Sequence, residues 1–331
     1  MSQVVPGARP RLSSIQEPVR AELDRVDDEL RRIVLSDFDR IGEVNDHLLF
    51  MQGKLFRPTL LLLSSRVGGT RPEQALTLAA VVELVHLATL VHDDSVDHSV
   101  LRRGQPTVNA LWTHQVAVIM GDYLYSRGVT ELARVGNLDA LAVLARAANE
   151  MSVGEMRQLT SHDALDFTEA DYYRLIAAKT ASLMSAACEM GAIVGAAEHR
   201  AALARYGHNL GMAFQIADDL LDYTGTEAAT GKPTGHDLRE RKVTLPLVGA
   251  LANASEAEER EIRHFFTRID PSDEEIGVIV GIVAERGGLD YSRARAGHYA
   301  DLAEKAISGM GSGSVTDALR DAISYAVDRS R

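Results

Sequence analysis

The sequence predicts an all-α protein that forms one domain. Apolar residues recur three and four positions apart along almost the whole chain, which is the spacing of helices that each bury one face. Alternating runs rich in Val, Ile and Thr, which are typical of strands, are absent from the sequence. No shift in composition and no internal repeat marks a domain boundary. Residues 1–331 are therefore expected to form a single helical bundle, with a poorly ordered tail over 1–14.

Glycine-rich turns divide the helical periodicity into separate segments. The expected helices are residues 15–35, 56–67, 73–98, 108–134, 138–160, 169–194, 197–223, 242–251, 256–267, 273–285, 289–307 and 314–329. Ser255, Asp270 and Ser314 stand near the starts of late segments. A side-chain oxygen there can accept a hydrogen bond from a free backbone N–H, so these residues are expected to be N-caps.

One segment, residues 73–98, is apolar nearly all the way round. Only Glu83 and His86 interrupt its run from Leu78 to His92. A helix without a polar face has to be enclosed by other helices, so this one is expected at the centre of the bundle.

Charge and cysteine content exclude several classes of protein. The net charge of −12 argues against general nucleic-acid binding and against a polybasic membrane anchor. A single cysteine, Cys188, rules out a disulfide framework and a cysteine metal site. No leader peptide is visible, and no segment reaches about 18 uncharged apolar residues. The protein is therefore expected to be cytoplasmic and to have no transmembrane segment.

Two short acidic motifs are the most informative feature of the chain. Each ends an apolar helical run, with Asp93, Asp94 and Asp97 in the first and Asp218, Asp219 and Asp222 in the second. Residues four apart share a helix face, so the first and last aspartates of each motif project side by side and repel by roughly 0.2–0.5 kcal/mol per pair. A compensating cation is expected. Mg²⁺ is bound through oxygen, by few carboxylates together with waters and substrate phosphates, which predicts a magnesium-bound phosphate or diphosphate as ligand.

Basic residues gather near both acidic motifs in the sequence. They are Lys54 and Arg57 before a helix, Arg102 and Arg103 after the first motif, and Lys232, Arg239, Arg241 and Lys242 after the second. The donors of Lys and Arg match phosphate oxygens. Two binding modes follow. One diphosphate can be held by the carboxylates through metal ions, and a second can be held directly by Lys and Arg without metal.

In their order and spacing, these elements resemble the trans-isoprenyl diphosphate synthase family, and within it the long-chain polyprenyl type. The resemblance rests on GKLFRP at 53–58, HDDSVDHSVLRRGQPT at 92–107, GDYLYSR at 121–127, GEMRQL at 154–159, AAKTASL at 177–183, FQIADDLLD at 214–222 and GKPTGHDLRERKVTLP at 231–246. It covers roughly residues 45–250. It implies an orthogonal helical bundle of the isoprenoid synthase type around a central apolar cavity. The implied enzyme condenses an allylic diphosphate with isopentenyl diphosphate in successive head-to-tail additions.

The resemblance also implies a role for each matching residue. Mg²⁺, at three ions per site, would be bound by Asp93, Asp94, Asp97, Asp218, Asp219 and Asp222. The allylic diphosphate would contact Arg102, Lys179 and Lys232, and isopentenyl diphosphate would contact Lys54, Arg57, His86 and Arg103. Thr180 and Gln215 would turn neutral oxygens toward the reacting carbons, and Asp237 and Lys242 would belong to a flap after the second motif.

These residue types fit the implied chemistry. An allylic diphosphate ionises to a delocalised carbocation when cations neutralise its leaving group in a water-poor cavity. Neutral oxygen dipoles stabilise the carbocation without capturing it, and apolar walls exclude the water that would quench it. The double bond of isopentenyl diphosphate then attacks. Loss of a proton, for which the departing diphosphate is the expected base, leaves an allylic product five carbons longer, so no side-chain nucleophile is required.

Product length is expected to be set one helical turn before the first acidic motif, because the growing tail runs along that helix. Ala88 and Thr89 lie at that point, followed at further turns by Leu84, Val85 and then Val81. None of these residues is aromatic, whereas short-chain relatives carry a bulky aromatic side chain there. The expected product has twenty-five carbons or more, and a short-chain farnesyl or geranylgeranyl diphosphate synthase is the alternative.

Three other functions share some of these sequence features. A class I terpene cyclase shares the acidic first motif and the all-α fold, but its second metal motif is usually of the Asn/Ser/Glu type. Two Glu-x-x-His pairs, Glu83 with His86 and Glu261 with His264, have the spacing of di-iron carboxylate bundles. A subunit that only supports a catalytic partner tends to lose its metal motifs, and both are whole here.

The resemblance carries expectations about partners as well. Most members of the family form homodimers through helices near the first acidic motif, and some medium- and long-chain members need a second, dissimilar chain. A homodimer is expected here, and a heteromer is left open. Nucleic acid is not an expected partner, whereas a transient membrane contact for product release is.

Overall fold

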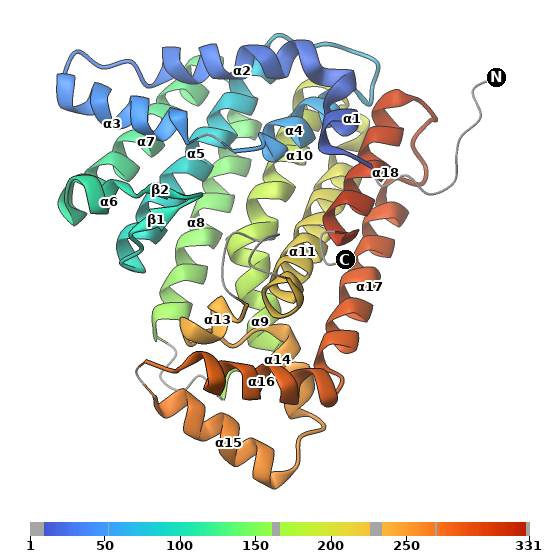
Figure 1. The fold of residues 1–331 in the computed structure, drawn as a ribbon. Helices are drawn as coiled ribbons and strands as arrows, with labels where there is room; N and C mark the ends of the chain where they lie inside the picture. Colours follow the sequence, from blue (N-terminus) through green and yellow to red (C-terminus); the bar gives the residue numbers. More distant parts are fainter. Residues whose placement is uncertain (1–9, 52, 161–165, 226–233, 269, 329–331) are drawn as a thin grey trace.

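The structure is a computed structural model that describes residues 10–51, 53–160, 166–225, 234–268 and 270–328. Its helices are α1 (Leu12–Gln16), η1 (Glu17–Val19), α2 (Arg20–Ile33), α3 (Asp39–Phe50), α4 (Phe56–Arg66), α5 (Gln74–Val96), α6 (Val108–Leu111), α7 (His114–Val135), α8 (Leu138–Thr160), α9 (Glu169–Ile176), η3 (Ala177–Ala181), α10 (Ser182–Gly195), η4 (Ala197–His199), α11 (Arg200–Thr224), α13 (His236–Arg239), α14 (Leu245–Leu251), α15 (Glu256–Thr267), α16 (Asp273–Glu285), α17 (Gly288–Ile307) and α18 (Ser314–Val327). Strands β1 (Leu101–Arg102) and β2 (Gln105–Pro106) form a short antiparallel hairpin. This hairpin is the only sheet within the described residues, so the all-α prediction is confirmed (Figure 1).

Helix α5 lies inside the bundle, as its all-apolar sequence predicts. It packs against α2, α4, α7 and α10. Among the described helices, α5 alone is long and apolar enough to cross a membrane, but 67% of its most apolar window is buried within the protein. The core helix of a bundle has the same length and composition, and here the neighbouring helices cover it. The last turns of α5 carry the first acidic motif out of this core.

A π-helical segment, η3, interrupts the long helix formed by α9 and α10, and it carries Lys179 and Thr180. It is held between α8 and α11, which approach it through glycines. A Cβ atom at Gly154 of α8 would lie 2.7 Å from the Ala178 Cβ, and one at Gly211 of α11 would lie 2.6 Å from the Ala181 Cα. Side chains at these two glycines would push the neighbouring helices away from η3. Single π-turns within α-helices occur frequently at functional sites.

A smaller apolar core lies at the lower end of the molecule in Figure 1, where α13, α14, α15 and α16 gather. Its buried residues include Tyr223 at the end of α11, Leu238 of α13 and Leu247 of α14. This core anchors the stretch from Gly235 to Thr244, which follows the second acidic motif along the chain.

The amino-terminal region differs from its prediction. Residues 1–9 lie outside the described part of the chain, but α1 already begins at Leu12, so the tail predicted over 1–14 was wrong for its last residues. The helix predicted over 15–35 is divided, because Pro18 lacks a backbone N–H and stands at the start of the tighter turn η1. Helix α3 was not predicted, since Gly42 and several polar residues interrupt its short apolar stripe.

The predicted helix caps were right in one case of three. Ser255 caps α15 and its hydroxyl accepts a hydrogen bond from the Glu258 N–H. At α16 the N-cap is Ser272 rather than Asp270, and its hydroxyl accepts from the Glu275 N–H. At α18 the N-cap is Gly313, so Ser314 is the first helical residue. The two errors displace helix starts by no more than a turn.

Candidate active site

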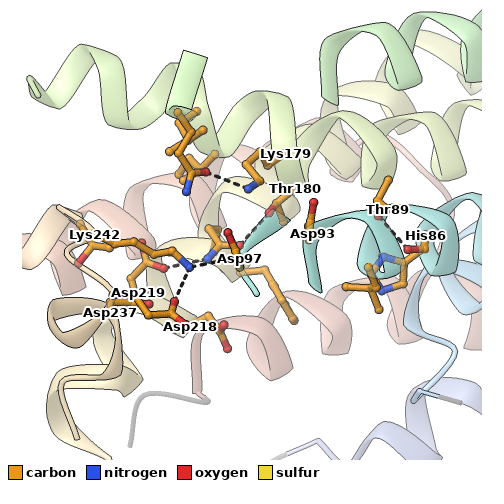
Figure 2. Close-up of a pocket in the computed structure, with 18 of the residues that line it drawn as sticks. His86, Thr89, Asp93, Asp97, Lys179, Thr180, Asp218, Asp219, Asp237 and Lys242 are labelled. Carbon is orange, nitrogen blue, oxygen red and sulfur yellow. Dashed lines mark hydrogen bonds and ion pairs between the residues drawn. The ribbon is translucent and has the colours of Figure 1, made fainter. Parts of the chain in front are cut away.

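One large cavity, of about 1320 Å³, gathers most of the residues that the sequence singled out. Its walls come from the start of α4, from α5, the hairpin, the end of α8, α9, η3, α11, the segment after α11 and α18. The predicted residues that line it are Lys54, Arg57, His86, Thr89, Asp93, Asp97, Arg102, Arg103, Lys179, Thr180, Gln215, Asp218, Asp219, Asp237 and Lys242 (Figure 2). Lys232 lies outside the described residues. Segments far apart in the sequence therefore meet at one site.

The first acidic motif presents two of its three aspartates to this cavity. Asp93 and Asp97, one helical turn apart on α5, line it. Asp94 does not appear among the described residues of the wall. It is 5% exposed, and the Arg102 guanidinium donates to it from Nε at 2.8 Å and from Nη2 at 2.7 Å. This two-pronged ion pair ties the hairpin to the end of α5.

The second acidic motif also presents two of its three aspartates to the cavity, but at different positions of the motif. Asp218 and Asp219 line the cavity, whereas Asp222 is not among its described wall residues. The two carboxylate oxygens of Asp222 accept hydrogen bonds from the backbone N–H groups of His236, at 3.1 Å, and Asp237, at 3.0 Å. Asp222 thus satisfies free N–H groups at the start of the short helix α13. The sequence predicted six aspartates around the cavity; the structure brings four of them to its wall and turns two toward other parts of the protein.

Burial raises the pKa of carboxylates on both sides of the cavity. The pKa of Asp93 is raised to about 6, first by burial, with further contributions from Glu155 and Asp97 against the opposing pull of Lys179. The pKa of Asp237 is also raised to about 6, by burial and then by the negative charge of Asp222. Burial therefore disfavours the charged form of these carboxyl groups, and a cation bound beside them would favour it.

The donor set of the cavity fits a hard divalent cation such as Mg²⁺. Carboxylate oxygens are the donors, and in Figure 2 those of Asp93 and Asp97 approach from α5 while those of Asp218 and Asp219 approach from α11. Within the described residues no three Asp, Glu, His or Cys side chains are close enough to hold one ion unaided. An ion there would need oxygens from a substrate, which is how Mg²⁺ binds phosphates.

Three cations of the cavity are paired with protein groups. Lys179 on η3 donates to Gln158 Oε1 at 2.9 Å and forms an ion pair with Glu155 of α8. Lys242 donates to Glu240 Oε2 at 2.6 Å, and its Nζ lies 3.9 Å from Asp97 Oδ2. Arg102 is held by Asp94, as described above. The acceptors of Lys179 and Lys242 are ones that a diphosphate oxygen can replace.

A basic pocket adjoins the carboxylates in the same cavity, lined by Lys54, Arg57, His86 and Arg103. Arg103 donates to the Met51 carbonyl at 2.8 Å, which brings the hairpin against the loop before α4. The Nε of Arg57 is buried and has no hydrogen-bond acceptor among the described residues. Burial, and then the charges of Arg57 and Arg103, hold the pKa of His86 well below its usual range, so His86 is neutral at pH 7. An anion with several oxygens would satisfy these donors.

Backbone strain is concentrated at the same site. Within the described part of the chain, Leu55, His98, Arg103 and Arg241 are the residues other than glycine with positive φ, at 50°, 52°, 52° and 59°. Three of the four, all except His98, line the cavity. Such conformations cost roughly 1 kcal/mol or more each and persist only where surrounding contacts enforce them.

The residues predicted to limit product length lie on two faces of α5. Thr89 lines the cavity together with His86 and Leu90. Ala88, Leu84, Val85 and Val81 are buried at 2%, 0%, 0% and 0% exposure and are not among the described residues of the wall. Val81, Leu84 and Val85 instead face Gly128 of α7. Of the residues predicted to limit product length, Thr89 is therefore the one found on the described wall of the cavity.

Several residues of the site were not predicted. Glu155 and Gln158 hold Lys179, Tyr172 holds Asp219, and Tyr325 of α18 contacts Lys54 and the ring of Phe56. Glu155 and Gln158 are polar residues of the helical GEMRQL motif, and this position in a motif was the sequence signal for their place in the site. Nothing in the sequence near Tyr325 indicates its place in the cavity, because that contact joins residues from the two ends of the chain.

The di-iron alternative has no support in the described residues. Glu83 and His86 line the cavity. Glu261 and His264 are exposed residues of α15, a helix whose buried face belongs to the separate lower core. The two Glu-x-x-His pairs therefore do not share a site.

The fold and the cavity define a helical bundle in which two acidic motifs and a basic pocket share one cavity, and comparison with known proteins identifies its family. The polyprenyl synthetase family matches residues 39–283. Heptaprenyl diphosphate synthase component 2 of Geobacillus stearothermophilus is 35% identical over 319 residues, covering 95% of this chain and 98% of that protein. The crystal structure of a decaprenyl diphosphate synthase from Rhodobacter capsulatus has a TM-score of 0.91 at 38% identity, covering 97% of this chain and 100% of that chain.

A polyprenyl synthase from Caulobacter crescentus CB15, solved with calcium and isoprenyl diphosphate, also has a TM-score of 0.91, at 35% identity, and covers 98% of this chain and 99% of that chain. The chain belongs to the polyprenyl synthetase family, the trans-prenyl diphosphate synthases. It is thus a prenyltransferase of isoprenoid biosynthesis with the all-α isoprenoid synthase fold, as the sequence predicted.

Proposed function

We propose that the protein is a Mg²⁺-dependent long-chain synthase, which adds isopentenyl diphosphate repeatedly to an allylic diphosphate and releases a trans-polyprenyl diphosphate of twenty-five carbons or more. One observation carries this proposal. Carboxylates from α5 and α11 line the same cavity as the basic pocket of Lys54, Arg57, His86 and Arg103. The cavity therefore offers two different anion sites side by side, one suited to a metal-bound diphosphate and one suited to a metal-free diphosphate.

The residues of the chain divide the work of the reaction. Asp93, Asp97 and Asp218 would hold Mg²⁺, which when bound neutralises the charge of the leaving diphosphate. Lys179 exchanges its protein acceptors for diphosphate oxygens, while Arg102 stays oriented by Asp94 and turns its remaining donors toward the diphosphate. The basic pocket holds isopentenyl diphosphate with its double bond directed toward the allylic carbon. This arrangement supplies proximity and charge neutralisation, which are the main requirements of ionisation followed by addition.

Oxygen dipoles and apolar walls protect the carbocation. Thr180 and Gln215 line the cavity on the side of η3 and α11. Their oxygens stabilise positive charge without forming a bond to it. Phe56 and Phe214 stack with ring centroids 5.8 Å apart, and both line the cavity, so they exclude water beside the basic pocket. The proton lost after addition passes to the departing diphosphate.

Small side chains at the end of the cavity support the long product. Thr89 lies one helical turn before Asp93 and lines the cavity, and its neighbour Ala88 is buried behind the wall. Thr89→Tyr should shorten the product, because an aromatic ring would fill the path of the tail, and Ala88→Tyr should shorten it less, because Ala88 is buried behind the cavity wall. Chromatography of the dephosphorylated alcohols measures this directly, and unchanged lengths in both variants would contradict a stop at this turn.

We also propose a homodimer in the cytoplasm. Exposed apolar side chains lie on α7, at Val118 and Ile119, and on α8, at Val153 and Met156. A second copy packed on these helices would bury them. The relative named as component 2 of a heptaprenyl diphosphate synthase leaves a dissimilar second subunit as the alternative. A single mass by light scattering at twice 35.9 kDa would support the homodimer.

Release of so apolar a product is expected to involve a transient membrane contact.

A product assay tests the proposed function. Purified protein is incubated with labelled isopentenyl diphosphate and each of three allylic primers, with Mg²⁺ or with a chelator, and the resulting alcohols are sized. The expected result is a ladder ending at twenty-five carbons or more, seen only with Mg²⁺. A product that stops at fifteen or twenty carbons would indicate a short-chain synthase. Cyclic hydrocarbons formed from the primer alone would indicate a terpene cyclase.

A further inference from the structure

A chain of hydrogen bonds connects α9 to η3 through the second acidic motif. The Tyr172 hydroxyl donates to Asp219 Oδ2 at 2.5 Å. The Gln215 side-chain amide donates to Asp219 Oδ1 at 2.8 Å. The Thr180 hydroxyl donates in turn to Gln215 Oε1 at 2.7 Å. Four side chains from three elements are thus linked. Three of them belong to the motifs that predicted the site, whereas Tyr172 lies outside those motifs.

The two members at the far end of the chain are deeply buried. Tyr172 is 1% exposed and Asp219 is 6% exposed. The Tyr172 hydroxyl donates its proton to Asp219 within this buried pair. A carboxylate in such surroundings is costly unless each oxygen has a donor. Tyr172 and Gln215 provide one donor for each oxygen.

The direction of each hydrogen bond determines the next one. Because Asp219 accepts from Gln215, the amide of Gln215 turns its NH₂ group toward Asp219 and its Oε1 toward Thr180. The hydroxyl proton of Thr180 is then donated within the hydrogen-bond chain, and the free lone pairs of Thr180 Oγ1 face the cavity. A flipped amide would instead face Thr180 with its NH₂ group. The hydroxyl proton of Thr180 would then turn to the cavity and place a positive dipole end beside the reacting carbons.

We propose that Tyr172 is a positioning residue which, through Asp219 and Gln215, fixes the orientation of the Thr180 hydroxyl so that its oxygen faces the reacting carbons. The inference rests on the proposed function, because it is the allylic carbocation that gains from this orientation. Tyr172 itself touches no reacting atom in this scheme. Its effect should therefore appear in the rate of the chemical step rather than in the binding of isopentenyl diphosphate, whose pocket lies with Lys54 and Arg57.

The first test compares two buried tyrosines. Tyr172→Phe removes one hydroxyl and should lower kcat about 10- to 100-fold, the factor expected for a lost hydrogen bond to a charged group, with the KM for isopentenyl diphosphate unchanged within about twofold. The control is Tyr206→Phe. Tyr206 is 0% exposed and donates to the Leu319 carbonyl at 2.7 Å, away from the cavity, so kcat and KM should both stay as in the wild type. Equal kinetics for the two variants would overturn the proposal.

A double-mutant cycle tests whether Tyr172 acts through Thr180. If the hydrogen-bond chain acts as one unit, the kcat of the double variant Tyr172→Phe/Thr180→Val should be little lower than that of the worse single variant. Losses that multiply would show independent action and overturn the proposal. Should circular dichroism show that Tyr172→Phe does not fold, Gln215→Leu, which removes the link between Asp219 and Thr180, replaces it in the cycle. Multiplicative losses with Thr180→Val are then equally decisive.

A structural measurement on metal-free protein separates this inference from the proposed function. The side-chain NH₂ signals of Gln215, identified by their loss in Gln215→Leu, should exchange faster with solvent in Tyr172→Phe than in the wild type or in Tyr206→Phe. Unchanged exchange would overturn the hydrogen-bond chain even in an active synthase. Faster exchange in a protein that makes no prenyl product would keep the chain and reject the proposed function.

Discussion

The two acidic motifs have the same sequence pattern, but the structure uses their carboxylates differently. On α5 the first and last aspartates, Asp93 and Asp97, line the cavity, while Asp94 pairs with Arg102. On α11 the first two aspartates line it, while Asp222 binds backbone N–H groups of α13. Spacing on a helix determines which residues share a face. The segment that follows each motif then decides which carboxylate remains for a ligand.

The difference has a local cause in each case. After α5 the chain turns into a tight hairpin, and Arg102 on that hairpin has a planar guanidinium that matches one carboxylate with two donors. After α11 the chain comes back as the short helix α13, whose first N–H groups need an acceptor. One motif thus supports a basic side chain, and the other supports a backbone segment.

The largest effect is expected where a carboxylate faces the cavity. Asp93→Ala and Asp218→Ala should each lower kcat by about 1000-fold or more, because a lost metal ligand leaves the leaving diphosphate uncompensated. Asp301→Ala, at an exposed position on α17, is the matched control and should keep the wild-type rate. Steady-state kinetics with circular dichroism measure both. A rate within tenfold of the wild type for either cavity variant would contradict the assignment.

A smaller effect is expected where a carboxylate supports an arginine. Asp94→Asn and Arg102→Lys should each lower kcat about 10- to 100-fold, since neither variant keeps the two-pronged ion pair. The double variant should lose little more than the worse single one, because the two residues are in contact. If Asp94→Asn proves as damaging as Asp93→Ala, then Asp94 itself belongs to the ligand site and the comparison fails.

The metal-free protein should show the cost of the buried carboxylates in its pH dependence. The pKa of Asp93 is raised from 3.8 to about 6 in the folded state, so its contribution to stability is full below about pH 4 and is lost as the pH rises through 6. Asp93→Asn removes this loss. The free energy of unfolding of the variant should therefore exceed that of the wild type by roughly 2 kcal/mol at pH 7 and should be close to it at pH 4. Thermal unfolding across this range measures the gain. A wild type that is the more stable of the two at pH 7 would reverse the sign and contradict the burial argument.

The smallest effect is expected at Asp222. Asp222→Asn keeps one acceptor for the His236 N–H but loses the one for the Asp237 N–H. The expected cost is about 1 kcal/mol of local stability, in the range of a lost helix cap, with a rate within about tenfold of the wild type. Hydrogen exchange at the amides of α13 should locate the loss. A collapse of activity like that of Asp218→Ala would mean that both motifs use all their aspartates alike.

The sequence was sufficient for the fold class and for most of the site. The all-apolar run of α5 predicted the central helix, and the acidic and basic motifs predicted the residues that meet in the cavity. Sequence spacing could not show that Asp94 and Asp222 turn away, because that depends on donors supplied by Arg102 and by the backbone of α13. It also could not find Tyr172, since a tyrosine on an amphipathic helix gives no sign of the carboxylate it will meet.

Product length shows the same limit. The pattern placed Ala88 and Thr89 at one turn of α5, but a helix has two sides, and of the two only Thr89 lies on the side that lines the cavity. Which side faces the ligand depends on how α5 is rotated against α7, and residues on both sides of α5 are apolar.

Calorimetry with a non-ionisable allylic diphosphate analogue tests the central claim most directly, namely that both acidic motifs hold one diphosphate through divalent ions. In the presence of Mg²⁺ the wild type should bind the analogue, while Asp93→Ala and Asp218→Ala should each lose this binding yet still bind isopentenyl diphosphate without metal. Tight Mg²⁺-dependent binding of the analogue by either variant would show that a single motif suffices and would contradict the claim.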